Sequence, residues 1–144
     1  MATSVQVVID CPDPDRLAHF WASALGYTLQ APPDGHASWE DFLRAAEVPE
    51  EEWNSASAVV DPDGVGPRIY FQRVPEPKTA KNRVHLDVNA GGGRGTPLDE
   101  RKVAIGAEVE RLIGEGATKV RAVEQRDEYW VVMHDREGNE FCVQ

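Results

Sequence analysis

Cysteine is scarce in this sequence, because a chain of 144 residues contains only Cys11 and Cys142. Two cysteines without a Cys-x-x-Cys pair build neither a disulfide framework nor the usual ligand spacing of a zinc finger. The nucleotide-binding and hydrolase patterns GxGxxG, GxxxxGKS/T, GxSxG and HExxH are absent as well. The glycine-rich run 90–96 therefore predicts a flexible loop between a strand and a helix, and a Rossmann or P-loop domain is excluded.

Positive charge is in the minority, since 15 Lys and Arg residues stand against 25 Asp and Glu residues and leave a net charge of −10. An acidic surface repels phosphate backbones, so we expect no nucleic-acid partner. Neutral or cationic small molecules are better suited to the negative electrostatic potential of such a surface. Solvation of the surface is the simpler explanation for most of the acidic side chains.

Long hydrophobic runs are missing too, and the sequence therefore predicts no membrane span and no membrane partner. The first residues, Met-Ala-Thr-Ser, lack the charged and apolar regions typical of a signal peptide. Hydrophobic residues make up 41% and charged residues 28%, a composition typical of a globular chain and not of a disordered one. We expect a cytoplasmic protein with reduced thiols and a single domain over 1–144.

The pattern of apolar residues predicts a strand, a helix and a second strand at the start of the chain. Residues 4–10 are rich in β-branched side chains, which favours a strand. Asp13 can cap the N-terminus of a helix, Pro14 suits its first position, and Gly26 suits a left-handed C-cap. Apolar residues recur at helical spacing between these ends, so one face of the helix should pack against a sheet.

The elements that follow predict the same order a second time. Ser38 begins a pattern typical of a helix N-cap, and two strands should follow that short helix. The predicted ranges are strands 27–30, 56–61 and 68–74, a proline-containing connection 75–83, strand 84–89, helix 97–115, and strands 118–123, 129–134 and 140–144.

Internal repetition is the most informative feature of the sequence. Residues 63–72 align without gaps on residues 135–144, at an offset of 72, and residues 5–7 match residues 84–86 at an offset of 79. This order predicts an α+β fold of two tandem βαβββ modules, with helices on the outer face of the sheet. Module one is expected at about 1–74 and module two at 84–144.

In each module the helix should cover one face of the sheet and leave the other face to form a cavity. Period-2 alternation places Phe141 and Val143 toward the helix. Polar side chains alternate with the apolar ones and should converge on the cavity face: Gln6, Arg68, Tyr70, Gln72, His85, Asp87, Asn89, Glu140 and Cys142. Such convergence is as typical of a ligand site as of a wetted surface.

These polar residues suggest two kinds of role. Asp87 and Glu140 are candidates for proton transfer, although Asp87 could equally order Arg68 or Arg83. The candidate ligand-binding residues are Arg68, Tyr70, Gln72 and Asn89.

Three segments resemble the vicinal oxygen chelate superfamily of glyoxalases, bleomycin resistance proteins and extradiol dioxygenases. They are residues 7–21 followed by Leu25-Gly26-Tyr27, residues 81–88, and residues 132–143. The resemblance is greatest to glyoxalase-like proteins, and it implies paired βαβββ modules that form a cupped, barrel-like mixed sheet, often in a homodimer. In metal-using members the ligands come from the first strand of each module and from the closing strand.

Carried over to this chain, the ligand positions fall on Gln6, His85 and Cys142, where Cys142 replaces a glutamate that is usual in the family. A Cys142 thiolate would complete a soft site for one divalent ion such as zinc, nickel or cobalt. Gln6 and His85 alone are two neutral ligands, too weak to hold the ion, and a metal-free cavity is the other interpretation. Glu140 lies on the same predicted face, but about 7 Å along the strand.

Two functions are consistent with this resemblance. One is a lyase or isomerase acting through an enediolate-type intermediate, with Glu140 or Asp87 moving a proton. The other is a non-catalytic protein of the bleomycin-resistance type, which sequesters a small and cationic compound. Both have a small-molecule ligand as partner, and fold alone does not choose between them.

Overall fold

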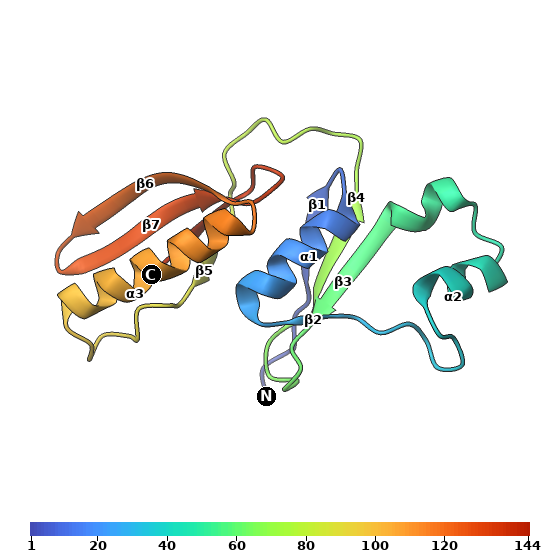
Figure 1. Ribbon diagram of the computed structural model, residues 1–144, viewed down its shortest axis with the longest axis horizontal. Coiled ribbons are helices and arrows are strands. Elements are labelled where there is room, and N and C mark those ends of the chain that lie inside the picture. Colours follow the sequence, from blue (N-terminus) through green and yellow to red (C-terminus); the bar gives the residue numbers. More distant parts are fainter. The chain divides into compact units, whose positions relative to one another are not determined.

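The chain folds into two compact units, Met1–Pro77 and Lys78–Gln144, in a computed structural model that describes all 144 residues. Each unit consists of a four-stranded mixed sheet with a helix packed on it (Figure 1). The strands and the principal helix of each unit follow one another in the order β-α-β-β-β, so the predicted α+β fold of tandem βαβββ modules is confirmed. No helix combines the length and the apolar character that a membrane span requires.

Unit one contains the strands β1 (Val7–Cys11), β2 (Thr28–Leu29), β3 (Ala56–Val60) and β4 (Ile69–Arg73), in the sheet order β1-β4-β3-β2. Helix α1 (Pro14–Leu25) begins and ends as predicted, since the Asp13 side chain accepts a hydrogen bond from the Arg16 N–H and Gly26 has a φ of 69°. The largest side chains of its buried face are Leu17, Phe20 and Trp21. They pack on the sheet, whose central strand buries Ile69 and Phe71.

An insert between β2 and β3 forms two short helices, α2 (Trp39–Ala45) and η1 (Glu50–Ser55). The hydroxyl of Ser38 accepts from the Asp41 N–H at 3.1 Å, which confirms the predicted cap of α2. Sequence reasoning did not predict η1. Its residue Asn54 bonds to Asp13 and to the Asp15 N–H at the start of α1, a contact across about 40 residues that no local pattern reveals.

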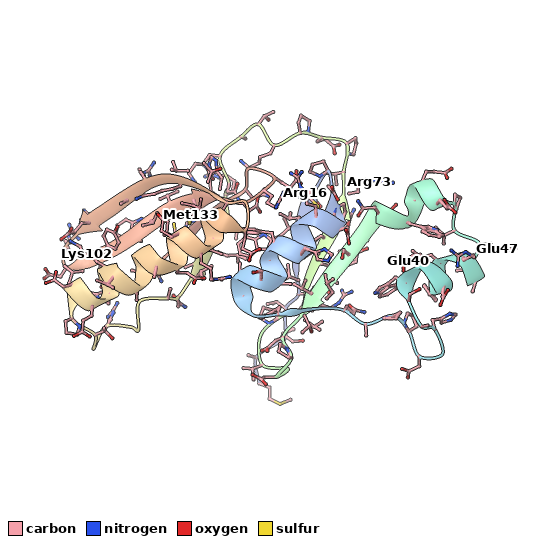
Figure 2. The ribbon with its side chains drawn as sticks, viewed as in Figure 1. Arg16, Glu40, Glu47, Arg73, Lys102 and Met133 are labelled. Carbon is pink, nitrogen blue, oxygen red and sulfur yellow. The ribbon has the colours of Figure 1, made fainter.

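Unit two contains β5 (Leu86–Val88), α3 (Leu98–Gly114), β6 (Thr118–Gln125), β7 (Glu128–His134) and β8 (Glu140–Val143), in the sheet order β5-β8-β7-β6. Helix α3 lies along one face of this sheet (Figure 1). Met133 on β7, labelled in Figure 2, is fully buried, as are Phe141 and Val143 on β8. The predicted burial of Phe141 and Val143 is therefore confirmed, and Cys142 between them is buried as well.

Strand registers show that the two units repeat one another. Val7 pairs with Ile69 in unit one, and Leu86 pairs with Phe141 in unit two. The equivalent residues are thus separated by 79 positions on the first strands and by 72 positions on the last strands, as the sequence indicated.

The turn before the last strand departs from the gapless alignment. Asp61 accepts hydrogen bonds from the backbone N–H groups two and four residues later, and Asp135 does the same. Asp61 is therefore the equivalent of Asp135, and the alignment of Asp63 with Asp135 was wrong. The turn of unit one is two residues longer than the turn of unit two. A gapless alignment anchored on the last strand cannot show where the two extra residues are inserted.

Candidate functional site

The face of the unit-two sheet opposite α3 brings together three of the predicted site residues. Asp87 on β5 pairs in register with Cys142 on β8, so their side chains lie side by side on this face. His85 immediately precedes β5, two residues before Asp87. Its Nε2 lies 3.4 Å from the nearer carboxylate oxygen, Oδ1, of Asp87.

His85, Asp87 and Cys142 form a cluster in which one nitrogen, one oxygen and one sulfur atom all lie within 4.8 Å of one another. The imidazole and the carboxylate are 46% and 42% exposed, whereas Cys142 is only 9% exposed. A buried thiol thus lies beside an accessible imidazole–carboxylate pair. This cluster is called the HDC cluster below.

The protonation of Cys142 follows from its surroundings. Burial raises the pKa of the Cys142 thiol, and the negative charge of Asp87 raises that pKa further. Lys81 and Arg121 act in the opposite direction with smaller effects. The thiol therefore keeps its proton at neutral pH unless a cation binds beside it.

The donor set of the HDC cluster fits a divalent transition metal. Ligand atoms around a tetrahedral zinc ion lie roughly 3.3 to 3.8 Å apart, given bonds of about 2.0 to 2.3 Å. Small side-chain rotations would bring the three donors of the cluster to that spacing. Nitrogen and sulfur ligands favour zinc, nickel or cobalt over magnesium. Asp87, which we expected to move a proton, supplies the third donor of this set.

Glu140 lies on the same face as Cys142, two residues earlier on β8, and is held by the segment that precedes β5. Its Oε2 accepts from Lys81 Nζ at 2.9 Å and from the Asn82 N–H at 2.8 Å. The hydrogen bond from Lys81 lowers the pKa of Glu140 most, followed by that from Asn82, so the carboxylate is ionised at neutral pH. Its role in proton transfer stays a prediction.

The open face of the unit-one sheet brings together Arg68, Gln6 and Tyr70. The Nη1 of Arg68 donates to Gln6 Oε1 at 2.7 Å, and its guanidinium carbon lies 5.2 Å from the centre of the Tyr70 ring. Its Nε donates to Gln30 Oε1 at 2.6 Å. Gln30 was not among the predicted residues, because it follows a two-residue strand and its pairing depends on the register with β3.

The two remaining candidates, Gln72 and Asn89, join neither group through a direct contact. Gln72 is exposed on β4. Asn89 follows β5 and accepts from the side chain of Gln144 at 3.1 Å. Seven of the nine predicted polar residues thus divide into an arginine-centred group in unit one and the HDC cluster, with Glu140 beside it, in unit two.

Comparison with known proteins identifies the family of this fold. A family model described as a glyoxalase-like domain matches residues 6–144, nearly the whole chain. The chain belongs to this family. The predicted membership in the vicinal oxygen chelate superfamily is confirmed, although no curated protein sequence matches the chain.

Solved structures of the superfamily share the fold of this glyoxalase-like protein. An enzyme of the glyoxalase/bleomycin resistance protein/dioxygenase family from Burkholderia phytofirmans is 16% identical, with a TM-score of 0.62 over 96% of this chain and 94% of that chain. The fosfomycin resistance protein FosX from Mesorhizobium loti is 7% identical, with a TM-score of 0.60 over 100% and 91%. A point mutant of FosX from Listeria monocytogenes, solved with Mn(II) and 1S,2S-dihydroxypropylphosphonic acid, is 8% identical, with a TM-score of 0.60 over 100% of this chain and 90% of that chain.

Proposed function

We propose that this glyoxalase-like protein binds one divalent metal ion at the HDC cluster and acts on a small molecule beside it as a lyase or isomerase. The observation that carries the proposal is the convergence of imidazole, carboxylate and thiol donors within 4.8 Å on the open sheet face. His85 and Cys142 are the ligands expected from the family resemblance. Asp87 replaces the carboxylate that the family usually takes from the position of Cys142.

Each residue of the cluster then has a definite task. His85 and Asp87 offer neutral and anionic ligands from the exposed side, and Cys142 offers sulfur from the buried side once it loses its proton. A bound ion would supply Lewis-acid stabilisation of negative charge that develops on a substrate oxygen. Cys142 would give up its proton to serve as a thiolate ligand.

Proton transfer is assigned to Glu140 when Asp87 serves as a ligand. Lys81 and Asn82 both bond to Oε2 of Glu140, and Oε1 receives no hydrogen bond. An ionised carboxylate with one unoccupied oxygen can accept a proton from a substrate. If Glu140→Gln abolishes turnover and leaves ligand binding within a few-fold, this role is supported; unchanged turnover would remove it.

Metal content measured by mass spectrometry tests the proposal most directly. The protein is purified without a chelator or a histidine tag, and Cys142→Ala, His85→Ala and Asp87→Asn are compared with wild type. We expect close to one zinc, nickel or cobalt ion per chain in wild type and loss of the ion in each variant. The matched control is Asp10→Asn, which removes an exposed carboxylate of β1 in unit one. Substoichiometric metal in wild type would contradict the proposal.

The two carboxylates on this sheet face, Asp87 and Glu140, support a second candidate, a non-catalytic protein of the bleomycin-resistance type. Without a metal the thiol stays neutral, and the face offers the two carboxylates of Asp87 and Glu140 to a cationic compound. A thermal-shift screen of small cationic compounds on the metal-free protein would test this function. It predicts binding without turnover, and weaker binding by Asp87→Asn.

A further inference from the structure

The guanidinium of Arg68 is held by neutral partners alone. Its two hydrogen bonds go to the side-chain amide oxygens of Gln6 and Gln30, and its third contact is the ring of Tyr70. No carboxylate forms an ion pair with it. Its positive charge is therefore not neutralised by the protein, although the chain as a whole carries a net charge of −10.

Arg68 and Arg101 are the least exposed arginines of this chain. Arg101 has the carboxylate partner that partial burial normally requires, because its Nη1 lies 2.9 Å from Glu128 Oε2. Arg68 lacks such a partner and is positioned by two amides instead. A bound anion would supply the negative charge that the Arg68 guanidinium lacks.

The guanidinium is also pre-oriented. Gln30 is fixed at three points: its N–H donates to the Ala58 carbonyl, its carbonyl accepts from the Trp39 indole at 2.7 Å, and its Oε1 accepts from Arg68. The hydrogen bonds to the two glutamine side chains use Nε and Nη1 of Arg68, so its Nη2 has no acceptor in the protein. A fixed guanidinium with free N–H groups suits a planar oxyanion, which it can bind through two parallel hydrogen bonds.

We propose that Arg68 forms a binding site for the oxyanion group, carboxylate or phosphonate, of an aromatic small molecule on the open face of the unit-one sheet. The ring of Tyr70, whose centre lies 5.2 Å from the guanidinium carbon, provides apolar surface beside this group. The site uses residues of unit one only and does not depend on metal at the HDC cluster. It favours a negatively charged ligand, whereas the net charge alone suggested a cationic one, because the nearest fixed charge determines the local field.

Titration of the chelator-treated full chain with four matched probes, followed by NMR, tests this site. Phenylacetate and phenylphosphonate carry the oxyanion, phenylacetamide is neutral, and phenethylamine is cationic. We expect both oxyanions to bind about tenfold or more tightly than the amide and the amine. The Nε–H resonance of Arg68 should shift on binding.

Two variants remove the site in different ways. Arg68→Met deletes the charge, and Gln6→Glu leaves Arg68 in place but supplies an internal carboxylate at the 2.7 Å contact. Both should weaken phenylacetate binding by about tenfold or more. Gln6→Glu should keep the melting temperature of wild type, which separates loss of the site from loss of the fold.

The matched control is Arg73→Met, which removes an equal charge from the other end of β4. Arg73, labelled in Figure 2, bonds to Ser55 and to the Glu51 carbonyl, both within η1, and makes no contact with the site residues. Its variant should bind phenylacetate within about twofold of wild type. The proposal is overturned if no oxyanion binds at millimolar concentration, if the amide binds as well as phenylacetate, or if Arg73→Met weakens binding as much as Arg68→Met. Loss of binding in Cys142→Ala but not in Arg68→Met would place the anion at the HDC cluster and would also overturn it.

Discussion

The imidazole Nε2 of His85 lies 3.4 Å from the carboxylate Oδ1 of Asp87, two residues further along the chain. Residues two apart on an extended chain share one face of the sheet, so this pair forms without any distant contact. The pairing of β5 with β8 places Asp87 opposite Cys142 and so brings the Cys142 thiol beside this pair. A three-donor cluster therefore arises within one βαβββ unit.

Metal retention should depend on Asp87 and not on Gln6. All three donors of the HDC cluster belong to unit two, and the oxygen of Gln6 accepts a hydrogen bond from the Arg68 guanidinium. We expect Gln6→Ala to keep the metal content of wild type and Asp87→Asn to lose it, as measured by mass spectrometry. If Gln6→Ala loses as much metal as His85→Ala, Gln6 is a ligand, as the family resemblance implied.

The reactivity of Cys142 should increase when Asp87 is neutralised. The carboxylate raises the pKa of the thiol, so Asp87→Asn lowers that pKa and increases the thiolate fraction at a given pH. We expect faster alkylation of Cys142 by iodoacetamide in metal-free Asp87→Asn than in metal-free wild type at pH 8. Mass spectrometry of the peptide separates Cys142 from Cys11. Equal rates, with Asp10→Asn as the control, would show that Asp87 does not act on the thiol.

Asp135 should stabilise its unit more than Asp63 does. Asp135 is 3% exposed and accepts from the Glu137 N–H, the Asn139 N–H and the Asn139 side chain. Asp135→Ala leaves these partly buried donors without an acceptor, so we expect a loss of about 2 kcal/mol of unfolding free energy. Asp63→Ala should change it by about 0.5 kcal/mol or less. Urea unfolding measures both, and equal losses would support the gapless alignment of Asp63 with Asp135.

Asp61 should make the stability of the protein dependent on pH in the acidic range. The backbone N–H of Gly66 lowers the pKa of Asp61 most, followed by that of Asp63. Because the folded-state pKa lies below the ordinary value of 3.8, the stabilisation is complete above that value and is lost as the pH falls through the lowered pKa. We therefore expect Asp61→Asn to melt below wild type at neutral pH and the difference to vanish in acid. Asp63→Asn is the control, and a difference that persists in acid would exclude this origin.

Much of the fold could be predicted, because helix ends and strand faces depend on neighbouring residues. Asp13, Pro14 and Gly26 act within one turn of α1, and the structure places its ends where these residues indicated. The alternation along β8 likewise predicted correctly that Phe141 and Val143 are buried. Strand lengths were less accurate: the first strand was expected at 4–10 and forms at Val7–Cys11, since its ladder can extend only along its partner β4.

The sequence by itself determined the order of the elements, the repeat of the two modules and the polar residues available to a site. Only the tertiary structure decided which of these residues meet. Arg68 is joined to Gln30 across 38 positions, and Lys81 is joined to Glu140 across 59. Such partners are set by strand register and by the path of the connecting loops, which bring distant residues within hydrogen-bonding distance. Local periodicity carries no information about that distance.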